Sequence, residues 1–348
     1  MSNIPEHPFR LAINGYGRIG RCFLRALHEA GLFANFPVVA INEPADLKSI
    51  SYLTRFDSTH GRFPGRVEVS EDHLVLDGHP VAVSHESTPE AVDWASLDID
   101  LLIECSGQYG TRGALERFLK AGCRRVLLSH PGQSAEDVDA TIVFGSNHVQ
   151  LNQASRIVSN ASCTTNAVVP VLGLIESELG IDQVLLTTLH AAMNDQPLID
   201  GYHHHDLRRT RSAMQSIIPV STGLARGVER LLPQLAGRVQ AKAIRVPTHN
   251  VSAIDMIISV QRDIDNATLN HMLESAAQDG SHGLIAYSEE AHASIDFNHD
   301  HHSAIIDGSQ THVSGRRLIN LLVWFDNEWG FANRMVDVTR YWLNQLAL

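Results

Sequence analysis

One cysteine and one histidine have the residue types and the spacing of a nucleophile and its base. Cys163 lies in SNASCTTNA, where a strand-like apolar stretch gives way to a segment of helical length, and His190 ends the apolar run QVLLTTLH. A helix N-terminus favours thiolate over thiol, and sequential strands can bring the imidazole beside the sulfur. A lone free cysteine is more often buried and inert. The pair therefore predicts a nucleophile where the cysteine alone would not.

A glycine-rich turn near the N-terminus predicts a dinucleotide site. Gly15, Gly17 and Gly20 form G-x-G-x-x-G between the strand-like FRLAIN and the helical RCFLRALHEAG. The glycines permit a tight turn and close approach of a pyrophosphate, which the N–H groups of the helix start can bind. Glu43 ends the next strand-like run, where a carboxylate accepts the ribose hydroxyls and repels a 2′-phosphate. The predicted cofactor is NAD, with a glycine turn that merely connects two elements as the alternative.

The composition is that of an ordinary globular protein, and the net charge limits the classes of partner that it can attract. Hydrophobic residues make up 44 % and charged residues 19 % of the chain, which excludes a disordered protein. The formal net charge of −12 excludes a broad attraction to nucleic acid or anionic membranes. We find neither a membrane-spanning run nor a signal-peptide pattern, and the four cysteines are widely spaced. Reduced thiols and a cytoplasmic location are therefore expected.

The pattern of apolar runs predicts an α/β protein of two domains. Short buried-type strands first alternate with helical stretches such as TRGALERFLKAG, which indicates a Rossmann-type, doubly wound parallel sheet. Longer strand-like segments, an irregular stretch over about 193–222 and the helical ATLNHMLESAAQ then indicate an α+β domain with a mostly antiparallel sheet. We expect an NAD-binding domain over 1–162, completed by a C-terminal helix over 328–348, and a catalytic domain over 163–327.

Several motifs resemble the glyceraldehyde-3-phosphate dehydrogenase superfamily, in order along nearly the whole chain. They are INGYGRIGR, SNASCTTN, TTLHAAMNDQ, SIIPVSTG, RVPT and WFDNEWGFANRM. The resemblance implies an NAD-dependent aldehyde dehydrogenase in which the Cys163 thiolate forms a thiohemiacetal and then a thioester, and His190 takes the proton. It also implies a homotetramer, with the stretch over 193–222 as a subunit contact.

The resemblance assigns further residues to the cofactor and to the substrate. Asn327 holds the nicotinamide carboxamide, and the remaining cofactor contacts join the glycines and Glu43, namely Tyr16, Arg18, Ile19, Ser106, Gly107 and Ser129. Six residues are expected to bind the substrate and its phosphate, namely Ser162, Thr164, Arg209, Thr222, Gly223 and Arg245. On composition alone, the arginines of DLRRTR would instead be a solvated loop or a subunit contact.

Finer details resemble the members that oxidise D-erythrose 4-phosphate, and these details are FDSTHGRF, LLSHPG, DLRRTRSAMQSIIP and SIDFNHDHHSAIIDGSQT. Met193 stands where glycolytic members usually carry threonine, so one hydroxyl donor to phosphate is missing. The alternative is that Met193 simply fills an apolar gap. The expected product is 4-phosphoerythronate, formed by thioester hydrolysis, which in the family feeds pyridoxal 5′-phosphate synthesis. Phosphorolysis with glyceraldehyde 3-phosphate, and a non-catalytic NAD-binding redox sensor, are the other two hypotheses.

Histidine-rich stretches raise the question of a metal site. The chain has 20 histidines, among them His203, His204, His205, His299, His301 and His302. Adjacent histidines in a loop rarely aim at one ion, and no cysteine or carboxylate spacing completes a ligand set. We therefore expect no metal.

Overall fold

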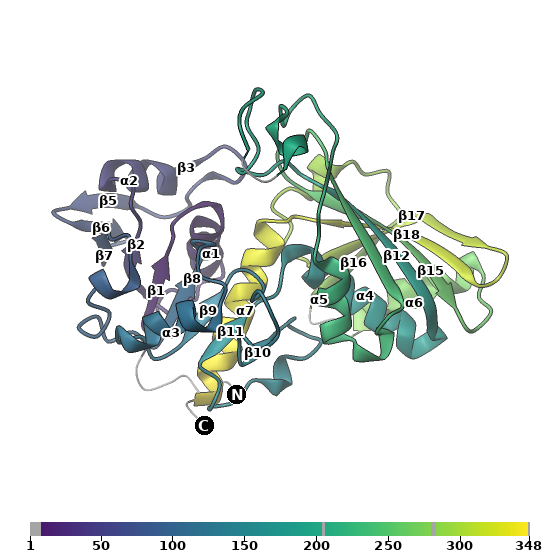
Figure 1. Cartoon of the computed structure of the whole chain (residues 1–348), viewed down its shortest axis with the longest axis horizontal. Coiled ribbons are helices and arrows are strands. Elements are labelled where there is room, and N and C mark those ends of the chain that lie inside the picture. Colours follow the sequence, from purple (N-terminus) through teal and green to yellow (C-terminus); the bar gives the residue numbers. More distant parts are fainter. Residues whose placement is uncertain (1–7, 204–205, 280–282, 347–348) are drawn as a thin grey trace. The chain divides into compact units, whose positions relative to one another are not determined.

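The chain divides into two compact units, each with its own sheet (Figure 1). The computed structural model describes residues 8–203, 206–279 and 283–346. One unit comprises Met1–Ser162 and Ala332–Leu348, and the other comprises Cys163–Phe331. Among the described residues, no helix is long and apolar enough to cross a membrane.

The first unit contains a nine-stranded sheet in the order β10-β11-β9-β8-β1-β2-β7-β6-β5. Neighbouring strands from β10 to β7 run parallel, and nearly all residues of the central strands are buried, so they form as continuous apolar runs. The strands are β1 (Leu11–Asn14), β2 (Val38–Asn42), β5 (Val67–Ser70), β6 (His73–Leu76), β7 (His79–Ser84), β8 (Leu101–Glu104), β9 (Val126–Leu128), β10 (Ala140–Thr141) and β11 (Ile157–Ser159).

One edge of this sheet is antiparallel, which the sequence analysis did not predict. Strands β5, β6 and β7 form two successive hairpins with two-residue turns. Glu71 begins the first turn at φ 52°, and Asp77 and Gly78 form the second at φ 48° and 85°. Left-handed residues at such positions match the twist of the flanking strands, so the chain doubles back instead of crossing over.

The helices of the first unit pack buried apolar residues into its core. They are α1 (Arg18–Glu29), α2 (Leu47–Arg55), α3 (Arg112–Lys120) and α7 (Trp329–Leu346), which belongs to this unit from Ala332 on. The unit also contains two 3-10 turns, η1 (Pro89–Ala91) and η2 (His148–Gln150), and a two-stranded ribbon of β3 (Phe56–Asp57) and β4 (Gly61–Arg62). The Phe118 ring in α3 is fully buried and packs edge-on against Trp94. In α7, Tyr341 packs against His148, with 4.8 Å between ring centroids.

The second unit contains a seven-stranded sheet in the order β13-β14-β12-β15-β18-β17-β16. Its neighbouring strands are antiparallel except for the pairs β12–β14 and β16–β17, so the expected mostly antiparallel sheet is confirmed. The strands are β12 (Ile181–His190), β13 (Ile218–Val220), β14 (Val239–Arg245), β15 (Ser252–Val260), β16 (Ile285–Ser288), β17 (Ala304–Ser314) and β18 (Leu318–Phe325).

Three helices pack on the strands of the second unit (Figure 1). They are α4 (Cys163–Leu179), α5 (Leu224–Leu231) and α6 (Asn266–Asp279), with 3-10 turns at η3 (Leu207–Thr210), η4 (Pro233–Leu235) and η5 (Ser294–Phe297). The stretch over 193–222 is mostly irregular, as expected, and contains η3 and the short strand β13. The parallel register of β12 and β14 pairs His190 with Arg245 at the carboxyl ends of the two strands. This register places two predicted site residues side by side.

Candidate active site

Cys163 is the first residue of α4, and its thiol lies beside the imidazole of His190. The Sγ–Nε2 distance is 3.7 Å. On the other side of the ring, Nδ1 lies 2.8 Å from the carbonyl oxygen of Ala191, which can only accept, so Nδ1 carries a proton and Nε2 faces the sulfur. Two residues before the cysteine, Ala161 has a φ of 57°, a backbone region that a non-glycine residue seldom adopts. The chain thus turns sharply into α4 and presents Cys163 at the helix start.

Electrostatics favour an ion pair between these two side chains. Burial alone would raise the pKa of the Cys163 thiol, but the hydrogen bond and charge of His190 and the contacts of Thr164 lower it below its ordinary value. Burial alone would lower the pKa of His190, but its contact with Cys163 raises the pKa. The arrangement therefore favours thiolate and imidazolium, the pairing that makes a cysteine nucleophilic at neutral pH.

Two arginines lie on the same side of this unit, and both contact Asp195. Arg245 donates from Nη1 and Nη2 to the two Asp195 oxygens, and Arg209 donates from Nη1 to Oδ2 at 2.9 Å. The side chain of Arg245 is only 9 % exposed, and Nη1 also donates to Gln196 Oε1 at 3.1 Å. The structure thus brings together both arginines predicted to bind phosphate, and it adds a carboxylate that the sequence analysis did not single out.

Small hydroxyl and backbone donors lie at the starts of α4 and α5. Thr164 Oγ1 lies 3.8 Å from the Cys163 sulfur, and Gly223 is the N-cap of α5, with Thr222 just before it. The two helices pack closely, because a Cβ built on Gly227 in α5 would lie 3.2 Å from the hydroxyl of Thr165 in α4. Ser162 directly precedes α4 and is partly exposed. These predicted substrate residues stand where helix N-termini offer donors to an anion.

Ser252, which the sequence analysis did not identify, connects two predicted site residues. Its hydroxyl donates to Asn327 Oδ1 at 2.8 Å and accepts from the backbone N–H of Ala191, next to His190, at 3.1 Å. The hydroxyl therefore fixes the orientation of the Asn327 amide and the end of β12. A serine at the start of a strand carries no distinguishing pattern, so the sequence offered no signal for this role.

In the first unit, each of the three glycines of the turn is suited to its position for a different structural reason. Gly15 has a φ of 85°, and a Cβ there would collide with the backbone of Ser106. A Cβ on Gly20 would collide with the carbonyl oxygen of Gly15, so that glycine lets α1 pack on the turn. No atom lies within 4 Å of a Cβ built on Gly17, which is exposed and caps α1 without a side-chain hydrogen bond. This open cradle at a helix N-terminus fits the pyrophosphate of NAD.

The other predicted cofactor residues of the first unit follow neighbouring parallel strands at their carboxyl ends. Glu43 follows β2, and its carboxylate accepts the backbone N–H of Tyr16 at 2.7 Å, so it reaches the glycine turn. Ser106 and Gly107 follow β8, and Ser129 follows β9. The carboxyl edge of a parallel sheet is where such folds bind dinucleotides. Ile19 is partly buried in the first turn of α1.

A fully buried carboxyl lies beneath this edge. Glu104, at the end of β8, accepts from the Ser106 N–H at 2.7 Å and from Asn14 Nδ2 at 2.5 Å. Asn14 in turn accepts from Asn42 Nδ2 at 2.8 Å, which connects the ends of three adjacent strands. Burial, the largest effect, raises the pKa of Glu104 to about 7, although the hydrogen bonds from Ser106 and Asn14 act to lower it.

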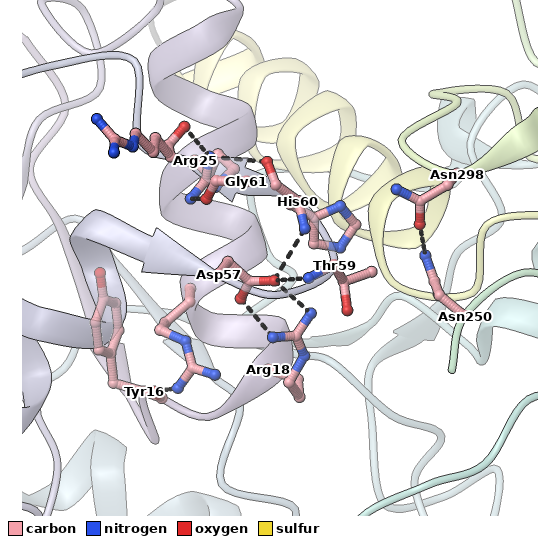
Figure 2. Close-up of polar contacts among 11 residues, drawn as sticks. Tyr16, Arg18, Arg25, Asp57, Thr59, His60, Gly61, Asn250 and Asn298 are labelled. Carbon is pink, nitrogen blue, oxygen red and sulfur yellow. Dashed lines mark hydrogen bonds and ion pairs between the residues drawn. The ribbon is translucent and has the colours of Figure 1, made fainter. Parts of the chain in front are cut away.

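Two predicted cofactor residues use their side chains within the protein. Figure 2 shows the Asp57 carboxylate accepting from Arg18 and from the backbone N–H groups of Thr59 and His60. Burial alone would raise the pKa of Asp57, but Arg18 and those N–H groups hold it well below its usual range. The buried Tyr16 hydroxyl lies 3.0 Å from Thr54 Oγ1. Cofactor binding by these two residues stays a prediction.

One group of histidines and a carboxylate lies together in the second unit. Ligand atoms of Asp300, His301 and His302 lie within 4.8 Å of one another. Asp300 Oδ1 lies 2.7 Å from His302 Nδ1 and also accepts the backbone N–H of His302 at 2.8 Å, so this carboxylate already has two hydrogen bonds. The ring of His299 stacks on Trp329 at 3.8 Å. His204 and His205 lie outside the described residues, and the absence of a metal stays an expectation.

We predict that His190→Asn slows alkylation of Cys163 by iodoacetamide at pH 7 by about tenfold, because the thiolate loses its cationic partner. The measurement is the alkylation rate against pH, with Cys163 followed by peptide mass spectrometry. His292→Asn is the matched control, since His292 Nε2 contacts Ser288 rather than the thiol. Identical pH profiles for wild type and His190→Asn would disprove the ion pair.

We predict that Gly17→Ala weakens NAD binding at least about tenfold while leaving the fold intact, because its methyl group would point into the open cradle. The dissociation constant is measured by calorimetry and folding by circular dichroism. Gly113→Ala is the control, since a Cβ on Gly113 also has no atom within 4 Å. Equal affinity in the two variants would contradict the assignment of the cradle.

We predict that Glu104→Gln removes a pH dependence of stability. The pKa of this carboxyl is 4.5 in the unfolded chain and about 7 in the folded protein. Between these two pH values the folded state therefore holds the proton and the unfolded state does not. The wild type should therefore lose about 2 kcal/mol of unfolding free energy between pH 5 and pH 7 relative to the variant.

Urea denaturation at both pH values measures that difference. Glu90→Gln is the control, because the pKa of the exposed Glu90, held by Arg117, is lowered to about 2 and lies outside this window. If wild type and Glu104→Gln change in parallel with pH, the buried carboxyl does not titrate there.

Two models of known protein families match the chain. The family model described as the NAD binding domain of glyceraldehyde 3-phosphate dehydrogenase matches residues 9–112. The model described as the C-terminal domain of glyceraldehyde 3-phosphate dehydrogenase matches residues 162–327. The two matches take in most of the chain and include the glycine turn, Cys163 and His190. The protein belongs to the glyceraldehyde-3-phosphate dehydrogenase family and is an NAD-dependent oxidoreductase acting on a phosphorylated aldehyde.

Proposed function

We propose that the protein oxidises D-erythrose 4-phosphate to 4-phosphoerythronate, a step that in the family feeds pyridoxal 5′-phosphate synthesis. The family supplies the reaction class, an NAD-dependent oxidation of a phosphorylated aldehyde. The observation that carries the proposal is the contact between Cys163 and His190, with Arg245 on the adjacent strand β14 and Arg209 joined to Arg245 through Asp195.

In the proposed mechanism, the Cys163 thiolate attacks the aldehyde carbon and forms a thiohemiacetal. His190, protonated on Nε2, stabilises the thiolate and gives that proton to the alkoxide oxygen of the adduct. The neutral Nε2 then takes the hydroxyl proton back as the hydride leaves. The backbone N–H of Cys163 at the start of α4 helps to hold the oxyanion. NAD, held at the glycine turn and Glu43, would supply the acceptor for the hydride of the former aldehyde carbon. Asn327, whose amide is fixed by Ser252, is proposed to orient the nicotinamide carboxamide.

The thioester is then resolved by water. The water oxygen bonds to the thioester carbon, the carbon–sulfur bond breaks, and Cys163 leaves as thiolate. His190 first releases the proton of the oxidation step to solvent. Its neutral Nε2 then takes the proton of the attacking water, which makes His190 the general base of this step. Met193, which is 47 % exposed and lies two residues before Asp195 in the chain, offers no hydroxyl donor to a second phosphate group. This supports hydrolysis over phosphorolysis.

We propose that the protein is a homotetramer and that the stretch over 193–222 contacts another subunit. Large apolar side chains of this stretch are strongly exposed, namely Leu198, Ile199, Tyr202, Leu207 and Ile217. Exposed apolar side chains gathered in one segment are typical of a protein interface. We also propose a cytoplasmic location, because the four cysteines are free thiols and the chemistry requires Cys163 reduced.

The test is NADH formation from D-erythrose 4-phosphate and from glyceraldehyde 3-phosphate, each with and without inorganic phosphate. We expect faster turnover of erythrose 4-phosphate, independent of phosphate, and loss of more than about 10³-fold of the rate in Cys163→Ser. Cys123→Ser is the control, because burial raises the pKa of that thiol to about 12 and makes it inert. Preference for glyceraldehyde 3-phosphate with strict dependence on phosphate would establish the glycolytic reaction instead. NAD binding without NADH formation from either aldehyde would support a redox sensor.

A further inference from the structure

We propose that Glu104 is a positioning residue for NAD and works as a neutral carboxylic acid. Its O–H donates to the Ser106 hydroxyl, so that this hydroxyl keeps its own hydrogen for the cofactor. The first unit then takes up one proton when NAD binds. NAD is the cofactor of the family, and Ser106 is one of the predicted cofactor residues. The proton concerns the cofactor rather than the choice of aldehyde, so its test needs no substrate.

The hydrogen bonds that Glu104 accepts come from uncharged groups. The side chain is fully buried at the end of β8, and its donors are the N–H and hydroxyl of Ser106 and the Asn14 amide. A Cβ built on Gly15 would collide with the backbone of Ser106, so the segment that contacts this carboxyl also touches the glycine turn. A buried carboxyl with neutral partners loses solvation when it ionises, which favours the acid form.

The Oε2 atom of Glu104 faces a group that can only donate. It accepts from Asn14 Nδ2 at 2.5 Å, and the Asn14 amide is fixed because its own oxygen accepts from Asn42 Nδ2 at 2.8 Å. The Asn42 amide is fixed in turn, since its oxygen accepts the Glu86 N–H at 2.9 Å. A proton on Glu104 therefore belongs on the other oxygen, Oε1.

The Oε1 atom contacts a group that can either donate or accept, the Ser106 hydroxyl. Beside a carboxylate, this hydroxyl uses its only hydrogen on Oε1. Beside the neutral acid, Oε1 donates and the hydroxyl keeps its hydrogen. The Ser106 oxygen also accepts the Gln108 N–H at 3.3 Å, so both of its lone pairs are then occupied. With Glu104 protonated, Ser106 thus offers the cofactor a donor.

The ionisable groups nearest to Glu104 bring no positive charge to its carboxyl. Burial and the charge of Glu104 raise the pKa of the Cys105 thiol and of the Tyr109 phenol, so both stay neutral near pH 7. Glu43, after β2, accepts the Tyr16 N–H, and His85, after β7, has its Nδ1 2.9 Å from the carbonyl oxygen of Glu43. Histidines in general change charge near neutrality, so a His85 variant serves as a control.

Binding of NAD and binding of this proton favour each other. Burial raises the pKa of Glu104 to about 7, so the acid form falls from about nine tenths at pH 6 to about one tenth at pH 8. A pyrophosphate held at the glycine turn adds negative charge, which opposes the carboxylate. Because the acid is the form that binds NAD, the apparent dissociation constant rises about tenfold between pH 6 and pH 8.

The first test is calorimetry of NAD binding without aldehyde at pH 6, 7 and 8. We expect the dissociation constant of the wild type to rise about tenfold over this range. At pH 7, the difference between PIPES and imidazole, buffers of low and high ionisation enthalpy, should show uptake of about half a proton per NAD. Glu104→Gln should take up no proton and bind NAD equally at each pH, whereas His85→Asn should match the wild type. Circular dichroism confirms that each variant is folded.

The second test addresses the hydrogen bond between Glu104 and Ser106. Ser106→Ala lacks the donor, so we expect NAD binding about tenfold weaker than in the wild type at pH 6. At pH 8 the two proteins should bind almost equally, because the wild-type hydroxyl then donates to the carboxylate. An infrared difference spectrum of the wild type at pH 8, with and without NAD, should gain the carbonyl band of a carboxylic acid that Glu104→Gln lacks.

The outcomes are decisive for the assigned proton and leave the substrate open. NAD binding by the wild type without proton uptake, or the same pH dependence in wild type and folded Glu104→Gln, would overturn the proposal. Loss of the pH dependence in His85→Asn would assign the proton to that histidine and overturn it as well. Equal affinities of wild type and Ser106→Ala at pH 6 would disprove donation through Ser106. The preference between the two aldehydes is measured separately, so either proposal can fail alone.

Discussion

The chemistry of this protein depends on the contact between the Cys163 sulfur and His190 Nε2 at 3.7 Å. It joins the first residue of a helix to the last residue of a strand, so its geometry is set by backbone elements rather than by flexible loops. Each partner shifts the pKa of the other in the direction that favours charge separation. A cysteine at this helix start without the histidine would be a partly buried thiol, and the histidine without the cysteine would have no reason to be protonated.

The rest of each unit serves to position groups at the ends of strands. In the first unit, the ends of β1, β2 and β8 are joined by hydrogen bonds through Asn14, Asn42 and Glu104, and predicted cofactor residues follow these strands. In the second unit, the parallel register of β12 and β14 pairs His190 with Arg245. Parallel strands bring their carboxyl ends to one edge, so residues far apart in sequence meet there.

Much of the fold and of the candidate site can be predicted from the sequence, because the signals that indicate them are local. The glycine turn, the helix that begins at Cys163 and the apolar run ending at His190 each occupy a short window with a clear pattern. The antiparallel edge of β5 to β7 was missed although Asp77-Gly78 is a recognisable hairpin signal. Asp195 and Ser252 were missed for a different reason, since their roles depend on partners 50 and 75 residues away along the chain. No local pattern reports such a pairing.

The most direct test of the central claim is to detect the acyl group on Cys163 itself. Enzyme mixed with NAD and D-erythrose 4-phosphate is quenched in acid within the first turnover and analysed by peptide mass spectrometry. We expect a phosphoerythronyl adduct on the Cys163 peptide, in step with the first NADH formed, and slower formation of both in His190→Asn, where the thiolate loses its cationic partner. NADH formed with no adduct, or with an adduct on Cys22, Cys105 or Cys123 instead, would contradict it.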